Sequence, residues 1–284
     1  MQASHAFQQG VLVWLGCDTD FPQGGYALLM SFLLAACFAF LLWWLGTGLV
    51  LWLDGLPKKT FVWSMLATSL FSGAGLYAAW WAQYETSQLA VYVAFAGGLS
   101  VWAWQEMSYY LGFVTGPRKQ ACEPGCSGWG HFLHALQTSL YHELSILLGA
   151  FMLWGLSREA EFAVAFWTYM VLWAMHESAR INVFLGVRHI NAEWLPEHLQ
   201  YLRSFLRQAP MNPWFPWSVA IAASGATWIF YQAWISQDPA QASAYYLIGA
   251  LAALALVEHA FLMLPIPLTA PWAWALGKRR RQTV

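Results

Sequence analysis

Seven long runs of mainly apolar residues dominate this sequence, and short polar stretches separate them. An α-helix of about 20 apolar residues crosses the hydrocarbon core of a bilayer, which is about 30 Å thick. The sequence therefore predicts an all-α polytopic membrane protein with about seven transmembrane helices, organised as a single integral membrane domain over residues 1–284. The predicted spans are Tyr26 to Leu53, Phe61 to Gln83, Gln88 to Phe113, Gly130 to Leu156, Glu161 to Val187, Trp214 to Ser236 and Ala242 to Leu264.

The composition supports a membrane protein and excludes several other classes. The chain is 59% hydrophobic and only 10% charged, which is more apolar surface than a soluble core needs. Membrane lipid is therefore an expected partner. A net charge of -1 gives no basis for nucleic-acid binding. The N-terminal residues lack the basic region of a secretory signal, so we expect them to be retained.

Positive charge alternates from loop to loop and predicts the orientation of the chain. Lys and Arg lie in the first loop (Lys58, Lys59), the third (Arg118, Lys119), the fifth (Arg188, Arg203, Arg207) and the tail (Lys278, Arg279, Arg280, Arg281). The second and sixth loops contain neither residue type, and the fourth contains only Arg158. Because cytoplasmic loops retain positive charge, the sequence predicts a periplasmic N-terminus and a cytoplasmic C-terminus.

Ionisable residues lie inside the apolar runs, most clearly in the doublets His142-Glu143 and His176-Glu177. Such groups cost several kcal/mol in hydrocarbon unless they are paired, so they indicate a functional site. With the predicted orientation, acids and imidazoles from four helices reach similar depths in the middle or the cytoplasmic half of the membrane. The candidate metal ligands are Glu106, His142, Glu143, His176, Glu177, Glu258 and His259. Arg180, one turn below the second doublet, is a candidate counter-charge.

Three interpretations of these residues remain open. They could bind a transition metal such as iron, zinc or manganese, although adjacent residues on a helix diverge by about 100°, so one member of each doublet would face away from a shared centre. An imidazole of His142, His176 or His259 could instead ligate a tetrapyrrole. The third interpretation is structural, with the groups paired across helices. The catalytic residues and the cofactor are not determined by the sequence.

The third loop, at about residues 114–129, and the helix after it carry a second candidate metal site, Cys122, Cys126, His131 and His134. Thiolates and imidazoles suit zinc, but the spacing is not that of a standard zinc finger. Pro124-Gly125 would explain a tight turn without metal. Redox-active thiols are a further alternative, disfavoured because cytoplasmic cysteines stay reduced.

A short amphipathic segment precedes the sixth run, at about residues 194–207. Leu195, Leu199, Leu202 and Leu206 recur at helical spacing. His198 and the two arginines, Arg203 and Arg207, would be turned away from this apolar side. The pattern predicts an interfacial helix on the cytoplasmic face of the membrane.

Three segments, GPRKQACEPGCSGWGHFLHALQTSLYHEL, MHESARINVFLGV and LPEHLQYLRSFLR, together resemble the PuhE family of photosynthetic complex assembly proteins of purple and related bacteria. The resemblance is dense from about Glu106 to Pro216. It implies a bacterial inner membrane, either intracytoplasmic or photosynthetic. It also implies a function in assembling the reaction centre and light-harvesting complex, or in modulating bacteriochlorophyll supply. The partners would then be subunits of the photosynthetic complexes or proteins of the bacteriochlorophyll pathway.

The resemblance brings no reaction with it, so a non-enzymatic membrane factor is the favoured function. The alternative is a membrane metalloenzyme with an intramembrane Glu/His site that acts on a lipid, quinone or tetrapyrrole.

Overall fold

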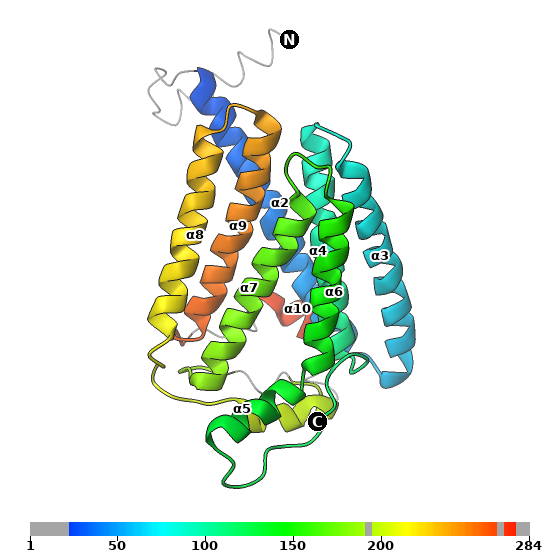
Figure 1. Ribbon diagram of the computed structural model, residues 1–284, viewed down its shortest axis with the longest axis vertical. Helices are drawn as coiled ribbons and strands as arrows, with labels where there is room; N and C mark the ends of the chain where they lie inside the picture. Colours follow the sequence, from blue (N-terminus) through cyan, green and yellow to red (C-terminus); the bar gives the residue numbers. More distant parts are fainter. Residues whose placement is uncertain (1–22, 191–194, 266–269, 277–284) are drawn as a thin grey trace.

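The computed structural model describes residues 23–190, 195–265 and 270–276, and over these residues the chain is all-α, as predicted (Figure 1). Helices occupy all seven predicted runs. Their bounds are α2 Gln23–Asp54, α3 Phe61–Ala82, α4 Gln88–Tyr110, α6 Leu140–Leu156, α7 Val164–Leu185, α8 Phe215–Ile235 and α9 Pro239–Phe261. Shorter helices are α5 Gly128–Gln137, α10 Ala273–Leu276 and the 3-10 helices η1 Lys58–Thr60, η3 Glu197–Phe205 and η4 Ala270–Trp272. The predicted retention of the N-terminal residues and the basic tail Lys278 to Arg281 concern positions outside the described residues.

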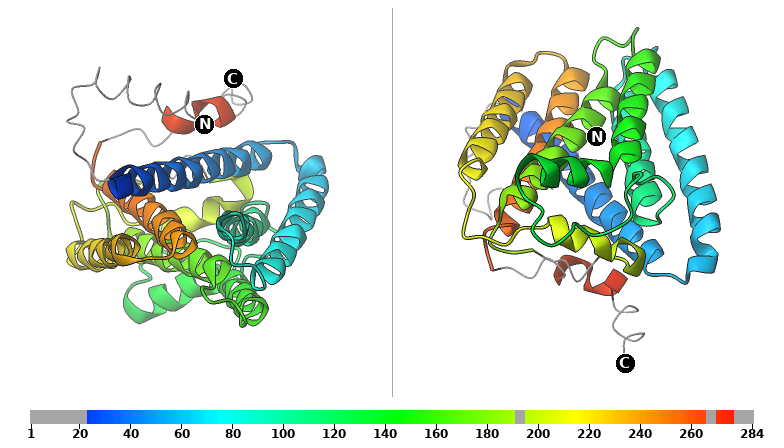
Figure 2. Two further views of the ribbon diagram at one scale, coloured as in Figure 1. Left: turned by 90° about the horizontal axis from the view of Figure 1, so that it is seen from above. Right: turned by 60° about the horizontal axis from the view of Figure 1, so that its bottom comes forward.

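The long helices form one bundle in which α4 and α9 lie centrally (Figure 2). α9 packs against α2, α4, α7 and α8, and α3 packs along α4. Small residues permit the closest approach, since a Cβ at Gly75 would lie 2.8 Å from the carbonyl oxygen of Gly97. Side-chain caps fix two of the helix starts, where Ser87 accepts a hydrogen bond from the N–H of Ala90 and Asp238 accepts from Ala240 and Gln241.

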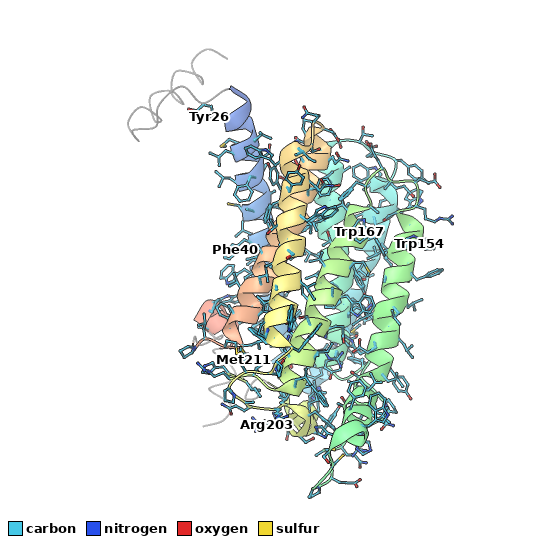
Figure 3. The ribbon with its side chains drawn as sticks, turned by 60° about the vertical axis from the view of Figure 1, so that its left-hand side comes forward. Tyr26, Phe40, Trp154, Trp167, Arg203 and Met211 are labelled. Atoms are coloured by element: carbon cyan, nitrogen blue, oxygen red, sulfur yellow. The ribbon has the colours of Figure 1, made fainter. Side chains whose placement is uncertain are left out.

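The outside of the bundle is apolar, as lipid contact requires. Leu70 is 78% exposed and Trp234 is 70% exposed, and large apolar side chains project along the length of the helices (Figure 3). By length and composition alone, three described helices could cross a membrane, or four if the bent pair α5 and α6 forms one span. The three are Leu28–Asp54, Lys58–Ala82 and Pro239–Phe261. The fold is therefore that of a membrane protein with several apolar helices.

The predicted fourth helix is not continuous, and this corrects the sequence prediction. α5 and α6 meet at a bend of 60° near Thr138 and Ser139. The preceding loop packs into this break, where the carbonyl oxygen of Thr115 accepts a hydrogen bond from the backbone N–H of His142. Only glycine fits at position 116 without a shift of the backbone, because a Cβ there would lie 2.0 Å from the carbonyl oxygen of Gln137. α5 therefore lies across the end of the bundle beside η3 (Figure 1).

The amphipathic segment folds as the 3-10 helix η3, and the protein itself covers its apolar side. Leu199, Leu202 and Phe205 are buried. His198 also faces inward, contrary to the predicted pattern, because its ring lies 2.9 Å from the carbonyl oxygen of Tyr110 and against Phe61. Burial of this imidazole lowers the pKa of His198 from its usual value. Arg203 lies at the same end of the bundle as Met211 (Figure 3).

Two buried asparagines join the end of α7 to the start of α8. The amide nitrogen of Asn212 donates to the side-chain oxygen of Asn182 and to the carbonyl oxygens of Asn182 and Gly186. Its own side-chain oxygen accepts from the backbone N–H groups of Trp214 and Phe215. Asn182 in turn donates to Ser218 on α8. The polar groups at this corner are thus satisfied within the protein.

Candidate functional site

Three helices bring one carboxylate and two imidazoles together near the end of the bundle that carries α5 and η3. Glu106 lies in the last two turns of α4, His142 in the first turn of α6, and His176 in the second half of α7. One ligand atom from each of the three side chains lies within 4.8 Å of the others. We call these three residues the Glu/His cluster.

The spacing within the cluster suits a metal ion. Oε1 of Glu106 lies 3.5 Å from Nδ1 of His176, and the rings of His142 and His176 are 6.0 Å apart between centroids. Two ligands at about 2.1 Å from a tetrahedral metal lie about 3.4 Å from each other. The Glu106 and His176 atoms therefore already have the separation of two ligands of one ion.

His142 is the least satisfied polar side chain of the cluster. It is 1% exposed, and neither ring nitrogen has a hydrogen-bond partner among the described residues. Oε1 of Glu106 also makes no hydrogen bond. A buried polar group without a partner costs about 1–3 kcal/mol. A bound ligand would remove this cost from both residues.

The glutamate of each His-Glu doublet forms an ion pair outside the cluster, while the histidine faces the cluster. This is the separation that the angle of about 100° between adjacent helical positions predicts. Arg180 forms ion pairs with both Glu143 and Glu177. Its other terminal nitrogen donates to Oγ of Ser139, at 2.6 Å. Arg180 is thus the counter-charge that the sequence suggested, and it ties α7 to the start of α6. The carboxylates of Glu143 and Glu177 are directed to it and not to the Glu/His cluster.

The structure does not bring Glu258 and His259 into the cluster. Glu258 is exposed on the outer surface, where it accepts a hydrogen bond from the indole N–H of Trp43. Nδ1 of His259 lies 2.9 Å from the carbonyl oxygen of Ala255, so it carries the proton and donates. Nε2 is then an acceptor for Oγ of Ser178, also at 2.9 Å. Both His259 nitrogens are occupied, and the residue fixes α9 against α7.

Other residues that support the cluster were not identified from the sequence. The ring of Tyr109 covers His142 at 4.6 Å, and the indole of Trp102 lies 5.4 Å from the ring of His176. Gln105 and Ser145 link α4 to α6 by reciprocal hydrogen bonds. These are uncharged aromatic, amide or hydroxyl residues in apolar runs, and only the contacts between helices distinguish them from their neighbours.

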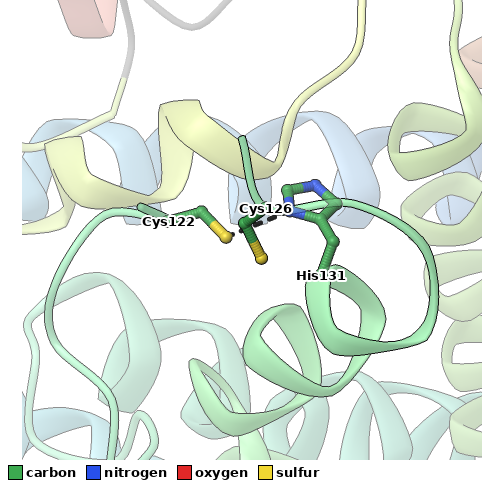
Figure 4. A group of neighbouring side chains, drawn as sticks. All are labelled: Cys122, Cys126 and His131. Atoms are coloured by element: carbon green, nitrogen blue, oxygen red, sulfur yellow. Dashed lines mark hydrogen bonds between the residues drawn. The ribbon is translucent and has the colours of Figure 1, made fainter. Parts of the chain in front are cut away.

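The second candidate site lies outside the bundle, where the loop before α5 meets the first two turns of that helix. Sγ of Cys122 is 3.2 Å from Nδ1 of His131, and Sγ of Cys126 lies beside them (Figure 4). Nδ1 of His134 lies 3.4 Å from Sγ of Cys126 and 3.6 Å from Sγ of Cys122. All four residues predicted for this site are thus close together. Both cysteines are free thiols in the structure.

The bend between α5 and α6 separates the two sites. The spacing of eleven residues between His131 and His142 would place them on one face of a continuous helix. Because the helix is broken between them, they belong to different clusters, and the column of histidines that this spacing suggests is not formed.

The fold and these clusters define, over the described residues, an all-helical membrane protein with a partly buried carboxylate and imidazole centre in its helix bundle. The chain belongs to the family described as protein of unknown function (DUF3623), whose model matches residues 29–283. It is 31% identical over 247 residues to a protein of Rhodobacter capsulatus, with 86% of this chain and 90% of that protein covered. That relative is described as an uncharacterized 30.4 kDa protein in the puhA 5′ region. No solved structure matches the chain.

Proposed function

We propose that this protein is a membrane factor for the bacterial photosynthetic apparatus, which helps to assemble the reaction centre and light-harvesting complex or modulates the supply of bacteriochlorophyll. The supporting observations are the relative described as lying in the puhA 5′ region of Rhodobacter capsulatus and the motif resemblance to photosynthetic complex assembly proteins. Neighbouring bacterial genes commonly serve one process. Membership of the PuhE family, as the motif resemblance implies, is part of this proposal, and its partners would be photosynthetic subunits or pigment-pathway proteins in the inner membrane.

The proposed topology has seven crossings, with the N-terminus in the periplasm and the C-terminus in the cytoplasm. Helices in all seven predicted runs and the alternation of basic loops support it. α5 and η3 would then lie at the cytoplasmic surface. The Glu/His cluster would lie in the membrane a short distance above them.

A deletion strain tests the biological function. Photosynthetically grown cells without the gene should contain less assembled complex or an altered bacteriochlorophyll level, as judged by the absorption spectrum of isolated membranes. A plasmid copy should restore both, and affinity capture should recover photosynthetic or pigment-pathway proteins. Normal pigment and normal complexes in the deletion strain would refute the proposal.

We further propose that the Glu/His cluster binds a divalent transition metal, with Glu106, His142 and His176 as ligands. The observation that carries this proposal is the buried His142 ring, whose two nitrogens have no hydrogen-bond partner among the described residues, beside a second imidazole and a carboxylate oxygen that makes no hydrogen bond there. Imidazole and carboxylate ligands suit iron, zinc and manganese. A tetrapyrrole on His142 is less compatible with this packing, because Tyr109 covers the ring and the side chain is 1% exposed.

Metal analysis of the purified protein tests this centre. Wild-type protein should contain iron, zinc or manganese at the cluster, and Glu106→Gln, His142→Gln and His176→Gln should each lose it. Glu258→Gln is the matched control, because this exposed glutamate pairs with Trp43 and lies outside the cluster. Unchanged metal content in all three cluster variants would exclude metal from this site.

A membrane metalloenzyme is the second candidate function, and one feature of the cluster favours it. Two histidines and one carboxylate leave coordination positions open for a substrate, as in non-haem iron oxygenases and several zinc hydrolases. A lipid, quinone or tetrapyrrole could reach such a centre from the membrane. If it is an enzyme, the His142→Gln protein should be normally inserted yet fail to restore pigment or complex levels in the deletion strain. Full restoration by that variant would favour the non-enzymatic factor.

A further inference from the structure

The loop before α5 and the first two turns of that helix bring two thiols and two imidazoles together. One ligand atom each of Cys122, Cys126 and His131 lies within 4.8 Å of the others. Cys122 and Cys126 flank a turn in which the N–H of Cys126 bonds the carbonyl oxygen of Glu123 and Gly125 has a φ of 83°. Only a residue without a Cβ adopts that conformation readily. α5 then supplies His131 and His134, which lie three residues apart and therefore face the turn together.

The sulfur–nitrogen distances in this cluster match those between the ligands of one zinc ion. Zinc binds thiolate at about 2.3 Å and imidazole at about 2.0–2.1 Å, so tetrahedral geometry separates a sulfur from a nitrogen by about 3.5 Å. Three sulfur–nitrogen distances in this cluster are 3.2, 3.4 and 3.6 Å. Each cysteine and each histidine takes part in at least one of them. His134 joins the other three residues through both sulfurs, since its Nδ1 lies within 3.6 Å of each of them.

Neighbouring residues orient the candidate ligands, as outer-shell residues do in metal sites. The ring of His131 is stacked between Phe184 of α7 and Phe205 of η3, with centroids 5.3 and 5.2 Å away. This stacking leaves its Nδ1 edge directed at Cys122. The backbone N–H of Cys122 donates to Oγ of Ser204 on η3. The loop, α5, η3 and the end of α7 thus meet at this cluster.

From these observations we propose that Cys122, Cys126, His131 and His134 bind one structural zinc ion, which fastens the loop and α5 to η3 and α7. Two thiolates neutralise the ion, and four protein ligands close its coordination sphere, so the site has no open position for substrate. The proposal is independent of the photosynthetic function and of the Glu/His cluster. Its consequence is that zinc fixes the position of α5 and of the break that begins α6.

Zinc content of full-length protein purified in detergent without chelator tests the site. We expect about one zinc per chain to be lost in the double variant Cys122→Ser, Cys126→Ser. Cys37→Ser is the matched control, because Cys37 lies on the exposed face of α2 far along the sequence from the cluster. Glu106→Gln separates the two sites, since it should leave this zinc in place. Full zinc content in the double variant would overturn the proposal.

A second measurement does not depend on the folding of the variants. In a Cys17→Ser, Cys37→Ser background, Cys122 and Cys126 should resist alkylation until a strong zinc chelator is added, and both should then react. Immediate alkylation of both thiols in the protein as purified, before any chelator is added, would overturn the proposal. Mass spectrometry that shows a disulfide between Cys122 and Cys126 would also overturn the proposal, in favour of a redox-active pair.

Discussion

At the residue scale, the two His-Glu doublets illustrate what helical geometry predicts. Adjacent positions diverge by about 100°, and the structure accordingly directs both histidines toward Glu106 and both glutamates toward Arg180. The sequence predicted Glu258 and His259 as ligands too, and their position outside the cluster was not predictable in the same way. Their separation from the cluster depends on the rotation of α9, which a depth estimate does not determine.

The ion pairs of Arg180 lead to a stability prediction. Arg180→Gln should lower the free energy of unfolding by roughly 2 kcal/mol, because it leaves two partly buried carboxylates unpaired. The effect is smaller than the about 3–5 kcal/mol of a fully buried pair, since the Arg180 side chain is 34% exposed. Thermal unfolding in detergent measures it.

The exposed pair of Lys58 and Glu197 is the matched control for this prediction, with side chains 66% and 88% exposed. Lys58→Gln should change the unfolding temperature little, as expected of exposed ion pairs. Equal losses of stability in Arg180→Gln and Lys58→Gln would contradict a special contribution of Arg180.

At the element scale, helix positions were predictable from apolar length, whereas the break between α5 and α6 was not. Thr138 and Ser139 carry no strong helix-breaking signal, and the break is stabilised by a distant segment through Thr115 and Gly116. The same limitation applies to η3. Its leucine spacing indicated an amphipathic element correctly, but not that α5 and the bundle would cover its apolar side.

Gly116 gives the test of this break. Gly116→Ala should destabilise the protein by about 1–3 kcal/mol, because its Cβ would overlap the backbone at the end of α5. Gly130→Ala is the control, since no atom lies within 4 Å of a Cβ there and alanine favours the helix. The two unfolding temperatures, measured side by side, should move in opposite directions. A harmless Gly116→Ala would contradict the described packing of the loop into the break.

At the scale of the whole molecule, the all-α fold and the membrane class followed from composition, and the number of crossings is the part that needs experiment. Three helices meet a simple hydropathy criterion, or four with the bent pair, and α4 and α7, which do not meet it, contain more polar residues. In α4 and α7 those polar residues include the Glu/His cluster and Arg180. The residues that indicate a functional site therefore also weaken the hydropathy signal of the helices that carry them.

Reporter fusions decide the topology. A reporter inserted within residues 117–128 or fused after Val284 should report the cytoplasm, and one near Glu85 should report the periplasm, because Lys and Arg are concentrated in the odd loops. A periplasmic signal from the insertion within residues 117–128 would reverse the proposed orientation. The zinc proposal would then concern an oxidising compartment, where the two thiols would form a disulfide more readily.

The buried asparagine pair at the corner between α7 and α8 has a mechanical consequence. Asn212 holds the last turn of α7 through three hydrogen bonds and the first residues of α8 through two more. His176 lies on α7 less than two turns before Asn182, so a shift of α7 along its axis on ligand binding would pull the start of α8 with it. The corner thus couples α7 to α8, so a displacement of α7 would be transmitted to α8 and to its apolar outer face.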